Sequence, residues 1–349
     1  MGELRAVVYS DIHHSAERID DTLKVENQIT DYCIKNGIKL VLFLGDRFKF
    51  RNPKGWIRDA VDRAWVQRMS QGISMITLVG QHDQYEKSRR LNSYNSFDVF
   101  KQNGIRAVDE DAVVDLMDGK KLFGQIHAVS YGSLGKYLAA VNDGKIIVDK
   151  KLLNIFVMHD MIKGARVSGE SDYTTSGLDK EFLEKFDLVL CGDIHLPQQL
   201  EFEHAKGGYV GSALQLTKAD IGSDRGFLDV TCSVLAKGEK AVKWMFVKSN
   251  APDFIEVNVD DIQDIQKYKN CFVYLRVGKI NQKQQQTIDT VKKVARHVFL
   301  IQEKEAKTNI KPIVGRDIYE ELDLYLDTIS TDLSKKELRE YIVEKVQQI

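Results

Sequence analysis

The sequence has few features that would tie it to an oxidising compartment, a membrane or a charged partner. Its 349 residues include only four cysteines, and no two of them form a C-x-x-C pair. This argues against a disulfide framework and against a cysteine zinc site. No run approaches the roughly 18 apolar residues of a membrane span. The N-terminal MGELRAVVYS also lacks the pattern of a signal peptide. We therefore expect a cytoplasmic protein without a membrane partner.

Charge of one sign is not in excess either. Lys plus Arg (50) nearly balance Asp plus Glu (51), which gives a formal net charge of -1. A chain with this balance has no global field that would attract a nucleic acid or an anionic membrane. Any surface that binds DNA must therefore be local.

One pattern recurs through the first two thirds of the chain. A short apolar run ends in a small residue and is followed by Asp or His. The instances are RAVVYSDIH (5–13), KLVLFLGD (39–46), SMITLVGQHD (74–83), LNIFVMHD (153–160) and DLVLCGDIH (187–195). Runs of this kind predict buried strands, and amphipathic stretches of helical length at 18–36 and 55–71 separate the first three. The alternation predicts βαβ units, in which polar ligands gather beyond the carboxyl ends of the strands.

The pattern stops after Asp229, which predicts further domains. We expect a main domain over 1–230 and a small α+β capping domain over 231–302. A polar segment with Pro312 predicts a linker over 303–315. Apolar residues at helical spacing predict two short helices in a tail over 316–349. Such helices either bind a partner or dock on the body of the protein.

The polar residues at the predicted strand ends form a candidate metal site. Asp11 and His13 are spaced i, i+2, so both side chains leave the same face if strand geometry persists. The other candidate ligands are Asp46, Gln81, His159, Asp193 and His195. Carboxylate, imidazole and amide ligands without a thiolate suit Mn²⁺ or Fe²⁺ better than structural zinc. Seven ligands are too many for one catalytic ion with an open position, and they suit two ions that share a carboxylate.

These segments resemble the motifs of the calcineurin-like metallophosphoesterases. DIH (11–13), GD (45–46), GQHD (80–83), MHD (158–160) and GDIHLP (192–197) are similar to the family motifs D-x-H, G-D, G-N-H-D/E, a lone His and G-H-x-H. GDIHLPQ, the segment 209–230 and the small domain with its helical tail further resemble the SbcD-type (Mre-type) subunit of double-strand-break repair nucleases, including phage versions. The resemblance covers roughly residues 5–230. It implies an α/β fold, a four-layer αββα sandwich followed by the capping domain and tail.

The resemblance also implies roles for the residues. Asp11, His13, Asp46 and His195 would hold one divalent ion. Asp46, Gln81, His159 and Asp193 would hold the other. Mn²⁺ is the expected metal, with Mg²⁺ or Fe²⁺ as alternatives. His82 would act on the leaving oxygen or on the charge of the transition state.

Three residues depart from the family pattern. Gln81 replaces the usual Asn, and Asp193 replaces the first His of G-H-x-H, so both changes fall on the same ion and make its site harder and more negative. Lys49 stands where the family has an acidic residue or a His that orients the catalytic histidine, and a lysine cannot accept a hydrogen bond from imidazole. We expect either that Asp83 orients His82 instead or that Lys49 contacts a phosphate.

A local basic rim supports binding of DNA. The segments 47–58 and 86–95 carry basic side chains interleaved with the aromatic residues Phe48, Phe50, Trp56 and Tyr85. The expected contacts to DNA or phosphate are His14, Lys49, Arg51, Lys54, Lys87, Arg89 and Arg90. For any one of these residues, a solvated surface charge is an equal alternative. The remaining histidines, His127, His204 and His297, are expected to be structural, and the three tryptophans to lie in the core.

Taken together, the sequence predicts a Mn²⁺-dependent DNA nuclease subunit, an exonuclease, an endonuclease or both. It would work by a two-metal mechanism with an SbcC-like ATPase of the SMC type bound to the C-terminal helices, as a homodimer, in the host cytoplasm if the chain is phage-encoded. Two rivals stay open. One is a phosphomonoesterase or cyclic-nucleotide phosphodiesterase of the same fold, since a fold does not fix its substrate. The other is a DNA-binding scaffold whose altered ligands have weakened catalysis.

Overall fold

The computed structural model describes residues 2–85, 95–97, 100, 105–168 and 172–302. The chain divides into two compact units, Met1–Ile301 and Gln302–Ile349. Only the first unit is described below. The linker expected over 303–315 and the helices expected over 316–349 lie outside the described residues, and they stay predictions.

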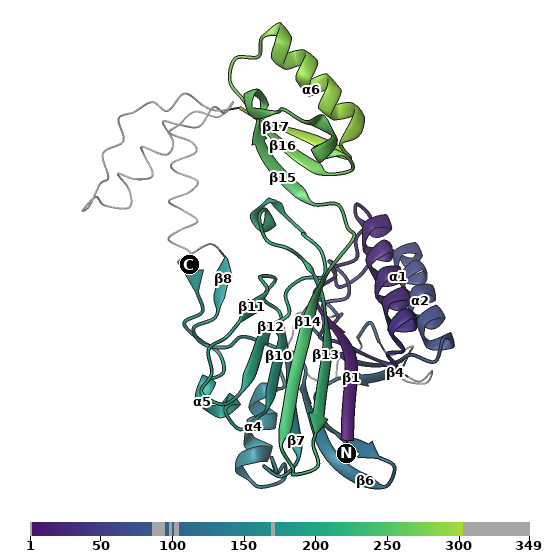
Figure 1. Cartoon of the computed structure of the whole chain (residues 1–349), viewed down its shortest axis with the longest axis vertical. Coiled ribbons are helices and arrows are strands. Elements are labelled where there is room, and N and C mark those ends of the chain that lie inside the picture. The colour runs from purple at the N-terminus through teal and green to yellow at the C-terminus, as the bar shows by residue number, and fades with distance from the viewer. Residues whose placement is uncertain (1, 86–94, 98–99, 101–104, 169–171, 303–349) are drawn as a thin grey trace, which may run out of the picture. The chain divides into compact units, whose positions relative to one another are not determined.

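Two six-stranded sheets form the body of the first unit (Figure 1). The first sheet has the order β14-β13-β1-β2-β3-β4 and the second β11-β12-β10-β7-β6-β5. The strands of the first are β1 (Gly2–Tyr9), β2 (Leu40–Phe43), β3 (Ser74–Leu78), β4 (Ile105–Val108), β13 (Gly226–Val234) and β14 (Lys240–Lys248). Those of the second are β5 (Asp111–Asp118), β6 (Lys121–Val129), β7 (Leu153–His159), β10 (Leu188–Gly192), β11 (Gln198–Gln199) and β12 (Lys206–Tyr209). In the first sheet, β1, β2, β3 and β4 run parallel. In the second sheet, β12, β10, β7 and β6 run parallel.

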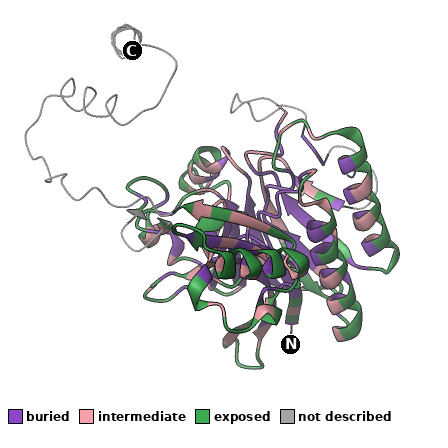
Figure 2. Ribbon diagram, turned by 90° about the horizontal axis from the view of Figure 1, so that it is seen from above, coloured by how far each residue is buried: buried purple, intermediate pink, exposed green. Residues whose placement is uncertain are grey.

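Helices cover the outer faces of both sheets. The helices α1 (Ile19–Asn36) and α2 (Gly55–Ser70) share a buried core with β1, β2 and β3, which includes Val25, Trp65 and Phe43. The helices α4 (Leu134–Asn142) and α5 (Lys180–Leu183) share a second core with β7 and β10. A third core, which includes Val8, Ile126 and Leu190, fills the space between the sheets. Three cores between four layers confirm the predicted αββα sandwich, and Figure 2 shows the buried residues on the sheets and on the inner sides of the helices.

A smaller α+β element follows the sandwich. It consists of β15 (Phe254–Asn258), β16 (Phe272–Val277), α6 (Gln282–Val294) and β17 (His297–Gln302), and it has a small core of its own. The expected domain boundary at 230/231 is wrong. It falls inside β13, and β14 also pairs in the first sheet along its whole length, from Gly226↔Lys248 to Val234↔Lys240. The remaining short elements are a hairpin of β8 (Arg166–Ser168) and β9 (Asp172–Tyr173) and the 3-10 turns Lys218–Asp220, Val259–Asp261 and Ile265–Tyr268.

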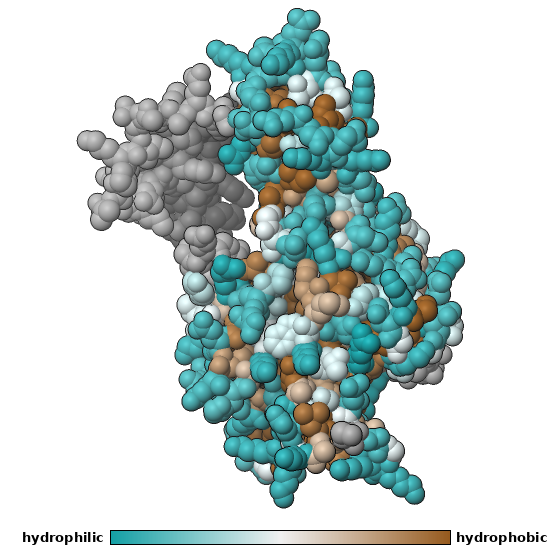
Figure 3. All heavy atoms as spheres, viewed as in Figure 1, coloured by the Kyte–Doolittle hydropathy of each residue, from teal (hydrophilic) through white to brown (hydrophobic). Residues whose placement is uncertain are grey.

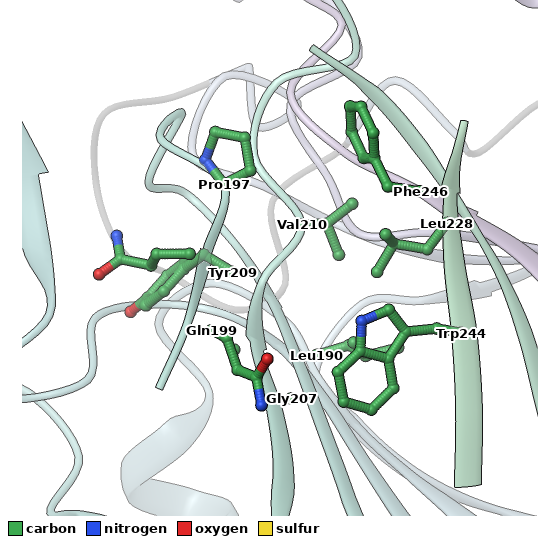
Figure 4. A pocket seen from close by; sticks show the side chains of 11 residues that line it. Leu190, Pro197, Gln199, Gly207, Tyr209, Val210, Leu228, Trp244 and Phe246 are labelled. Atoms are coloured by element: carbon green, nitrogen blue, oxygen red, sulfur yellow. The ribbon is translucent and has the colours of Figure 1, made fainter. Parts of the chain in front are cut away.

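The three tryptophans have different surroundings. Trp65 is fully buried, as expected. Trp244 is half-buried and lines an apolar cavity of about 250 Å³ between the edge strands of the two sheets, together with Phe246 and Val210 (Figure 4). Trp56 is 51% exposed, so the expectation that it belongs to the core is wrong.

The face of the molecule in Figure 3 is mainly polar. Hydrophilic residues predominate on the face in Figure 3, and the hydrophobic patches between them are small. In the part of the chain that the structure describes, no helix is long and apolar enough to cross a membrane.

Candidate metal centre

The predicted ligands follow the carboxyl ends of parallel strands, which lie side by side in each sheet. Tyr9 at the end of β1 pairs with Phe43 at the end of β2, and Phe43 pairs with Thr77 in β3. In the second sheet, Gly192 pairs with His159. The five motif loops therefore begin at equivalent positions, as expected for parallel strands in α/β folds.

The backbone at these loops is unusual. The described chain has five residues other than glycine with a positive φ, and four of them are candidate ligands: Asp11 (49°), His13 (48°), Asp46 (58°) and Asp193 (85°). Residues other than glycine rarely adopt this left-handed conformation, and where they do, the strain often marks a functional site. The strand geometry expected for Asp11 and His13 thus does not persist, but sharp turns bring their side chains to the same site.

Glycines in the motifs allow the loops to approach one another. A Cβ atom on Gly80 would lie 2.2 Å from Oδ1 of Asp46, and one on Gly45 would lie 2.5 Å from Nδ1 of His159. Neither contact is possible, so only glycine fits at these two positions. Gly45 and Gly80 therefore make room for the ligands His159 and Asp46.

Asp11, His13 and His195 form the first group of potential ligands. The two Nε2 atoms of His13 and His195 lie 3.1 Å apart, and they lie 3.9 Å and 4.0 Å from Oδ1 of Asp11. Burial, together with repulsion from His195 and His82, holds the pKa of His13 well below its usual value. His13 is therefore a neutral imidazole with a free lone pair, the form that binds metals.

Asp46 and His159 form a second group with Asp11, and Asp193 lies beside them. Nε2 of His159 lies 3.6 Å from Oδ1 of Asp46 and 3.8 Å from Oδ1 of Asp193. The Nδ1–H group of His159 donates a hydrogen bond of 2.6 Å to the carbonyl of Leu44, which directs Nε2 toward the carboxylates. Burial opposes a charge on His159, but the carboxylates of Asp46, Asp11 and Asp193 outweigh it and raise the pKa to about 9. The three carboxylates thus favour a positive charge at the position of Nε2 of His159.

Asp46 lies between the two groups. Its Oδ1 atom faces His159, and its Oδ2 atom lies 3.6 Å from Nε2 of His13. Burial raises the pKa of Asp46 well above its usual value, and Asp11 and Asp83 add to this effect. A carboxylate with one oxygen toward each group has the arrangement of a bridging ligand between two ions.

Two buried atoms of the site have no hydrogen-bond partner among the described residues, Oδ1 of Asp11 and Nε2 of His159. Buried polar atoms are rarely left without a partner, so such atoms call for an explanation. Oδ1 of Asp11 offers a lone pair, Nε2 of His159 offers one when its proton is displaced, and a cation would satisfy both atoms. The residues therefore fit a divalent metal ion.

An open cavity of about 520 Å³ gives access to these groups. Gln81 lines it with His13, His82, Asp193 and His195. The structure places Gln81 at the site, and its role as a ligand stays a prediction. Two cationic residues that the sequence did not single out, Arg18 and Arg225, also line the cavity. They lie outside the five motifs, so only the fold could reveal them.

His82 lies at the rim of the centre, with 35% of its side chain exposed. Its backbone N–H donates to Oδ1 of Asp46 at 2.8 Å, and its Nε2 atom lies 3.9 Å from Oδ2 of the same carboxylate. Its Nδ1–H group donates to the backbone carbonyl of Lys49 at 2.8 Å. Burial lowers the pKa of His82. The ring is thus held from one side, with its free nitrogen toward the ligands.

Asp83 does not orient His82, so that expectation is wrong. Its buried carboxylate accepts hydrogen bonds from the backbone N–H groups of Gly80, Asp46 and Arg47, at 2.9, 2.8 and 3.0 Å, and from the hydroxyl of Ser96 at 3.1 Å. Asp83 instead ties the loop after β3 to the loop after β2. The carbonyl of Lys49 takes the role expected of an acidic side chain.

His14 is not available to a substrate, contrary to the expectation. Its ring is fully buried, where its Nδ1 atom lies 2.7 Å from the hydroxyl of Thr22 and its Nε2 atom 3.3 Å from Oε1 of Glu26. Both partners belong to α1. The position next to a ligand suggested a contact to phosphate, but the turn at His13 directs the two neighbouring rings to different surroundings.

The described part of the basic rim is partly exposed. Lys49 and Lys54 are exposed, and Lys49 lines the cavity. Arg51 is half-buried and donates to the carbonyl of Gln84 at 3.2 Å. Phe50 is 57% exposed, like Trp56 in the same segment, whereas Phe48 is buried. Lys87, Arg89 and Arg90 lie outside the described residues, so the structure does not test them.

The other histidines lie away from the centre. His127 is buried, with its Nδ1 atom 2.9 Å from the hydroxyl of Tyr137, as a structural role requires. His204 and His297 are exposed.

Comparison with known proteins gives a family and a set of distant structures. No curated protein matches the chain. A protein from Staphylococcus aureus described as a 5'-nucleotidase, in complex with alpha-ketoglutarate, aligns at 11% identity and a TM-score of 0.44, over 83% of this chain and 58% of its own. A dimetal phosphatase from Danio rerio aligns at 9% identity and a TM-score of 0.41, over 72% of this chain and 100% of its own. Both relationships are too distant to carry an argument about substrate.

The family assignment rests on the match to the model of the calcineurin-like phosphoesterases over residues 4–197. This match covers more than half of the 349 residues and contains all five motif segments, from DIH (11–13) to GDIHLP (192–197). The chain therefore belongs to the calcineurin-like phosphoesterase family, and it is a metal-dependent hydrolase.

Proposed function

We propose that the chain is a Mn²⁺-dependent DNA nuclease, the SbcD-like subunit of a repair or recombination complex. One observation carries the proposal: Lys49, which lines the open cavity at the metal centre, belongs to a segment with exposed cationic and aromatic side chains. Lys49 lines the cavity, and Lys54, Phe50 and Trp56 of the same segment are exposed. Lysines neutralise backbone phosphates, and aromatic rings stack on bases. A phosphomonoester needs neither.

The proposal assigns two divalent ions to the ligands. Asp11, His13, Asp46 and His195 would hold one ion, and Asp46, Gln81, His159 and Asp193 the other. Bound there, such ions lower the pKa of a bound water and neutralise charge on the phosphate oxygens. Asp193 and Gln81 supply oxygen where the family motifs have nitrogen or a shorter amide. Mn²⁺ accepts mixed oxygen and imidazole ligands, which makes it the proposed metal, with Mg²⁺ or Fe²⁺ as alternatives.

His82 has the position of a residue that assists departure of the leaving group. Its Nδ1–H group is bound to the carbonyl of Lys49, so Nε2 is the atom that faces the site. A proton carried at Nε2 could pass to the leaving 3′ oxygen, and a positioned general acid typically contributes about 10²- to 10⁴-fold in rate. Partial exposure of the ring lets a large substrate reach it.

Cleavage assays separate the proposal from its rivals. The chain loaded with Mn²⁺ would be given a labelled DNA duplex, a labelled single strand and 4-nitrophenyl phosphate. Cleavage of DNA at a rate above that of the monoester supports the nuclease. Activity on the small ester alone would establish a phosphomonoesterase, and activity on none, with one bound ion or none, would establish a scaffold.

The proposal extends to the partners. An SbcC-like ATPase of the SMC type would bind the segment 316–349, and the subunit would form a homodimer. Deletion of 316–349 should abolish association with the ATPase and spare hydrolysis of DNA. Association that survives the deletion would contradict the assignment of the tail. Sedimentation of the purified chain would show whether it is a dimer.

A further inference from the structure

We infer that His14 is a positioning residue that sets the orientation of His82 through the backbone of Lys49. The inference rests on the proposed function, because it gives His82 a part in hydrolysis. It assigns a task to a buried histidine that touches neither ligand nor substrate. It also accounts for the loss of the acidic orienting residue at position 49.

The ring of His14 is anchored in α1 at both nitrogens. Glu26 is a carboxylate that can only accept, so the Nε2–H group of His14 donates to it, and Nδ1 of His14 accepts from the hydroxyl of Thr22 at 2.7 Å. Glu26, at 3.3 Å from Nε2, is itself held by Arg68 and by the indole N–H of Trp65. Thr22, Glu26, Trp65 and Arg68 are all completely buried. The anchor of His14 is therefore rigid.

The backbone of His14 is hydrogen-bonded to the neighbouring loop at Arg47 and Lys49. The N–H of His14 donates to the carbonyl of Arg47 at 2.9 Å, and the carbonyl of His14 accepts from the N–H of Lys49 at 3.1 Å. These two bonds form a parallel bridge between His14 and Phe48. Lys49 is thus fixed by its N–H group, while its side chain is exposed at the cavity.

The last step is the hydrogen bond from Nδ1–H of His82 to the carbonyl of Lys49, at 2.8 Å. Other acceptors near this loop are in use. The carboxylate of Asp83 accepts four hydrogen bonds, and Oδ1 of Asp46 accepts the backbone N–H of His82. A main-chain carbonyl can orient an imidazole as a carboxylate does, provided that the peptide itself is fixed. The anchor of His14 provides that support.

The test compares two buried histidines. His14→Ala removes the anchor, and His127→Ala removes a histidine that is equally buried but lies on β6 and contacts Tyr137. Each variant would be assayed with Mn²⁺ on single-stranded DNA, whose leaving group is a sugar hydroxyl, and on bis(4-nitrophenyl) phosphate, whose nitrophenolate leaves without a proton. His14→Ala should lower kcat on DNA by about 10- to 100-fold at unchanged KM, because a misplaced acid loses much of its effect. On the nitrophenyl ester the loss should be below about 3-fold, as a good leaving group needs little proton transfer.

A second readout does not depend on activity. Nitrogen-15 NMR of the metal-free protein reports which ring nitrogen of His82 carries the proton. In the wild type and in His127→Ala the proton should be on Nδ1, and in His14→Ala the signal should shift toward the Nε2–H form. His14→Gln, whose amide can bond to both Thr22 and Glu26, should restore part of the wild-type signal and rate. Thr22→Val tests the same anchor if His14→Ala does not fold.

The outcomes are separable. An unchanged His82 signal in His14→Ala and Thr22→Val, with equal losses on both substrates, would overturn the inference. If the wild type hydrolyses the nitrophenyl ester and not DNA, the proposed nuclease fails, and the NMR comparison still decides the role of His14.

Discussion

Nε2 of His159 lies 3.6 Å from Oδ1 of Asp46, and both residues are buried. The other oxygen of the same carboxylate faces His13. The two oxygens of Asp46 thus lie 3.6 Å from an imidazole of each group, His13 in the first and His159 in the second. The arrangement makes Asp46 the residue on which a two-ion site depends.

Replacement of Asp46 by Asn should therefore remove metal from both groups. An amide keeps the shape of the side chain but has one acceptor oxygen and no charge. We expect the number of Mn²⁺ ions bound per chain to fall from the two that the proposed function assigns to one or none, and kcat/KM to fall by at least about 100-fold. Metal content after dialysis, measured by mass spectrometry, checks the first expectation. The control is Asp160→Asn, which changes the carboxylate next to His159 that accepts from the N–H of Met161. It should keep both ions.

Asp193 offers a test of metal preference. The family motif has a histidine at this position, and Oδ1 of Asp193 lies 3.8 Å from Nε2 of His159. Asp193→His replaces an anionic oxygen by a neutral nitrogen, which favours softer ions. We expect the affinity for Zn²⁺ relative to Mn²⁺ to rise by about 10-fold or more in titration calorimetry. The same substitution at Asp224, which pairs with Lys248 away from the ligands, should leave the ratio as it is.

The sequence predicted the buried strands and the meeting of the candidate ligands because both follow from local rules, whereas the four layers were expected from the family resemblance. Apolar runs that end in Gly and Asp give buried parallel strands, and parallel strands bring their ends together. Asp11, Asp46 and His159 are accordingly where the pattern put them. The boundary at 230/231 could not be predicted in this way. The antiparallel pairing of β13 with β1 and of β14 with β13 joins the last strands to the first, and nothing near Asp229 indicates it.

The orientation of His82 was missed for a different reason. The expected acceptor was a side chain, and Asp83 was the candidate because a lysine at position 49 cannot accept a hydrogen bond. The acceptor is the main-chain carbonyl of Lys49, and every residue has such a group. Burial of His14 was missed because adjacent histidines after a strand look equivalent until the positive φ of His13 separates them.

The glycine of the third motif should be intolerant of any side chain. A Cβ atom at Gly80 would lie 2.2 Å from Oδ1 of Asp46 and 2.4 Å from its backbone nitrogen. Gly80→Ala must displace this carboxylate, so we expect loss of bound Mn²⁺ and a destabilisation of about 1–3 kcal/mol. The matched variant is Gly135→Ala in α4, where a Cβ meets nothing within 4 Å. It should bind metal normally and change the free energy of unfolding by less than about 1 kcal/mol. Equal metal binding by the two variants would contradict the packing argument.

The buried carboxylate of Glu26 should make stability depend on acid pH. Burial acts to raise its pKa, but Arg68, His14 and Trp65 outweigh burial and lower the pKa from 4.5 to about 2. A group with a lowered pKa in the folded state contributes its full stability above pH 4.5, and this contribution is lost as the pH falls toward 2. Glu26→Gln leaves Arg68 buried without its counterion, so we expect a loss of about 3–5 kcal/mol at pH 7. Urea unfolding between pH 3 and 7 measures the free energy of unfolding of both proteins. The difference in this free energy between Glu26→Gln and the wild type should become smaller below about pH 5. Glu239→Gln, at an exposed position, should show no such dependence on pH. If the difference in the free energy of unfolding between Glu26→Gln and the wild type stays constant with pH, the pKa of Glu26 is not lowered in the folded protein.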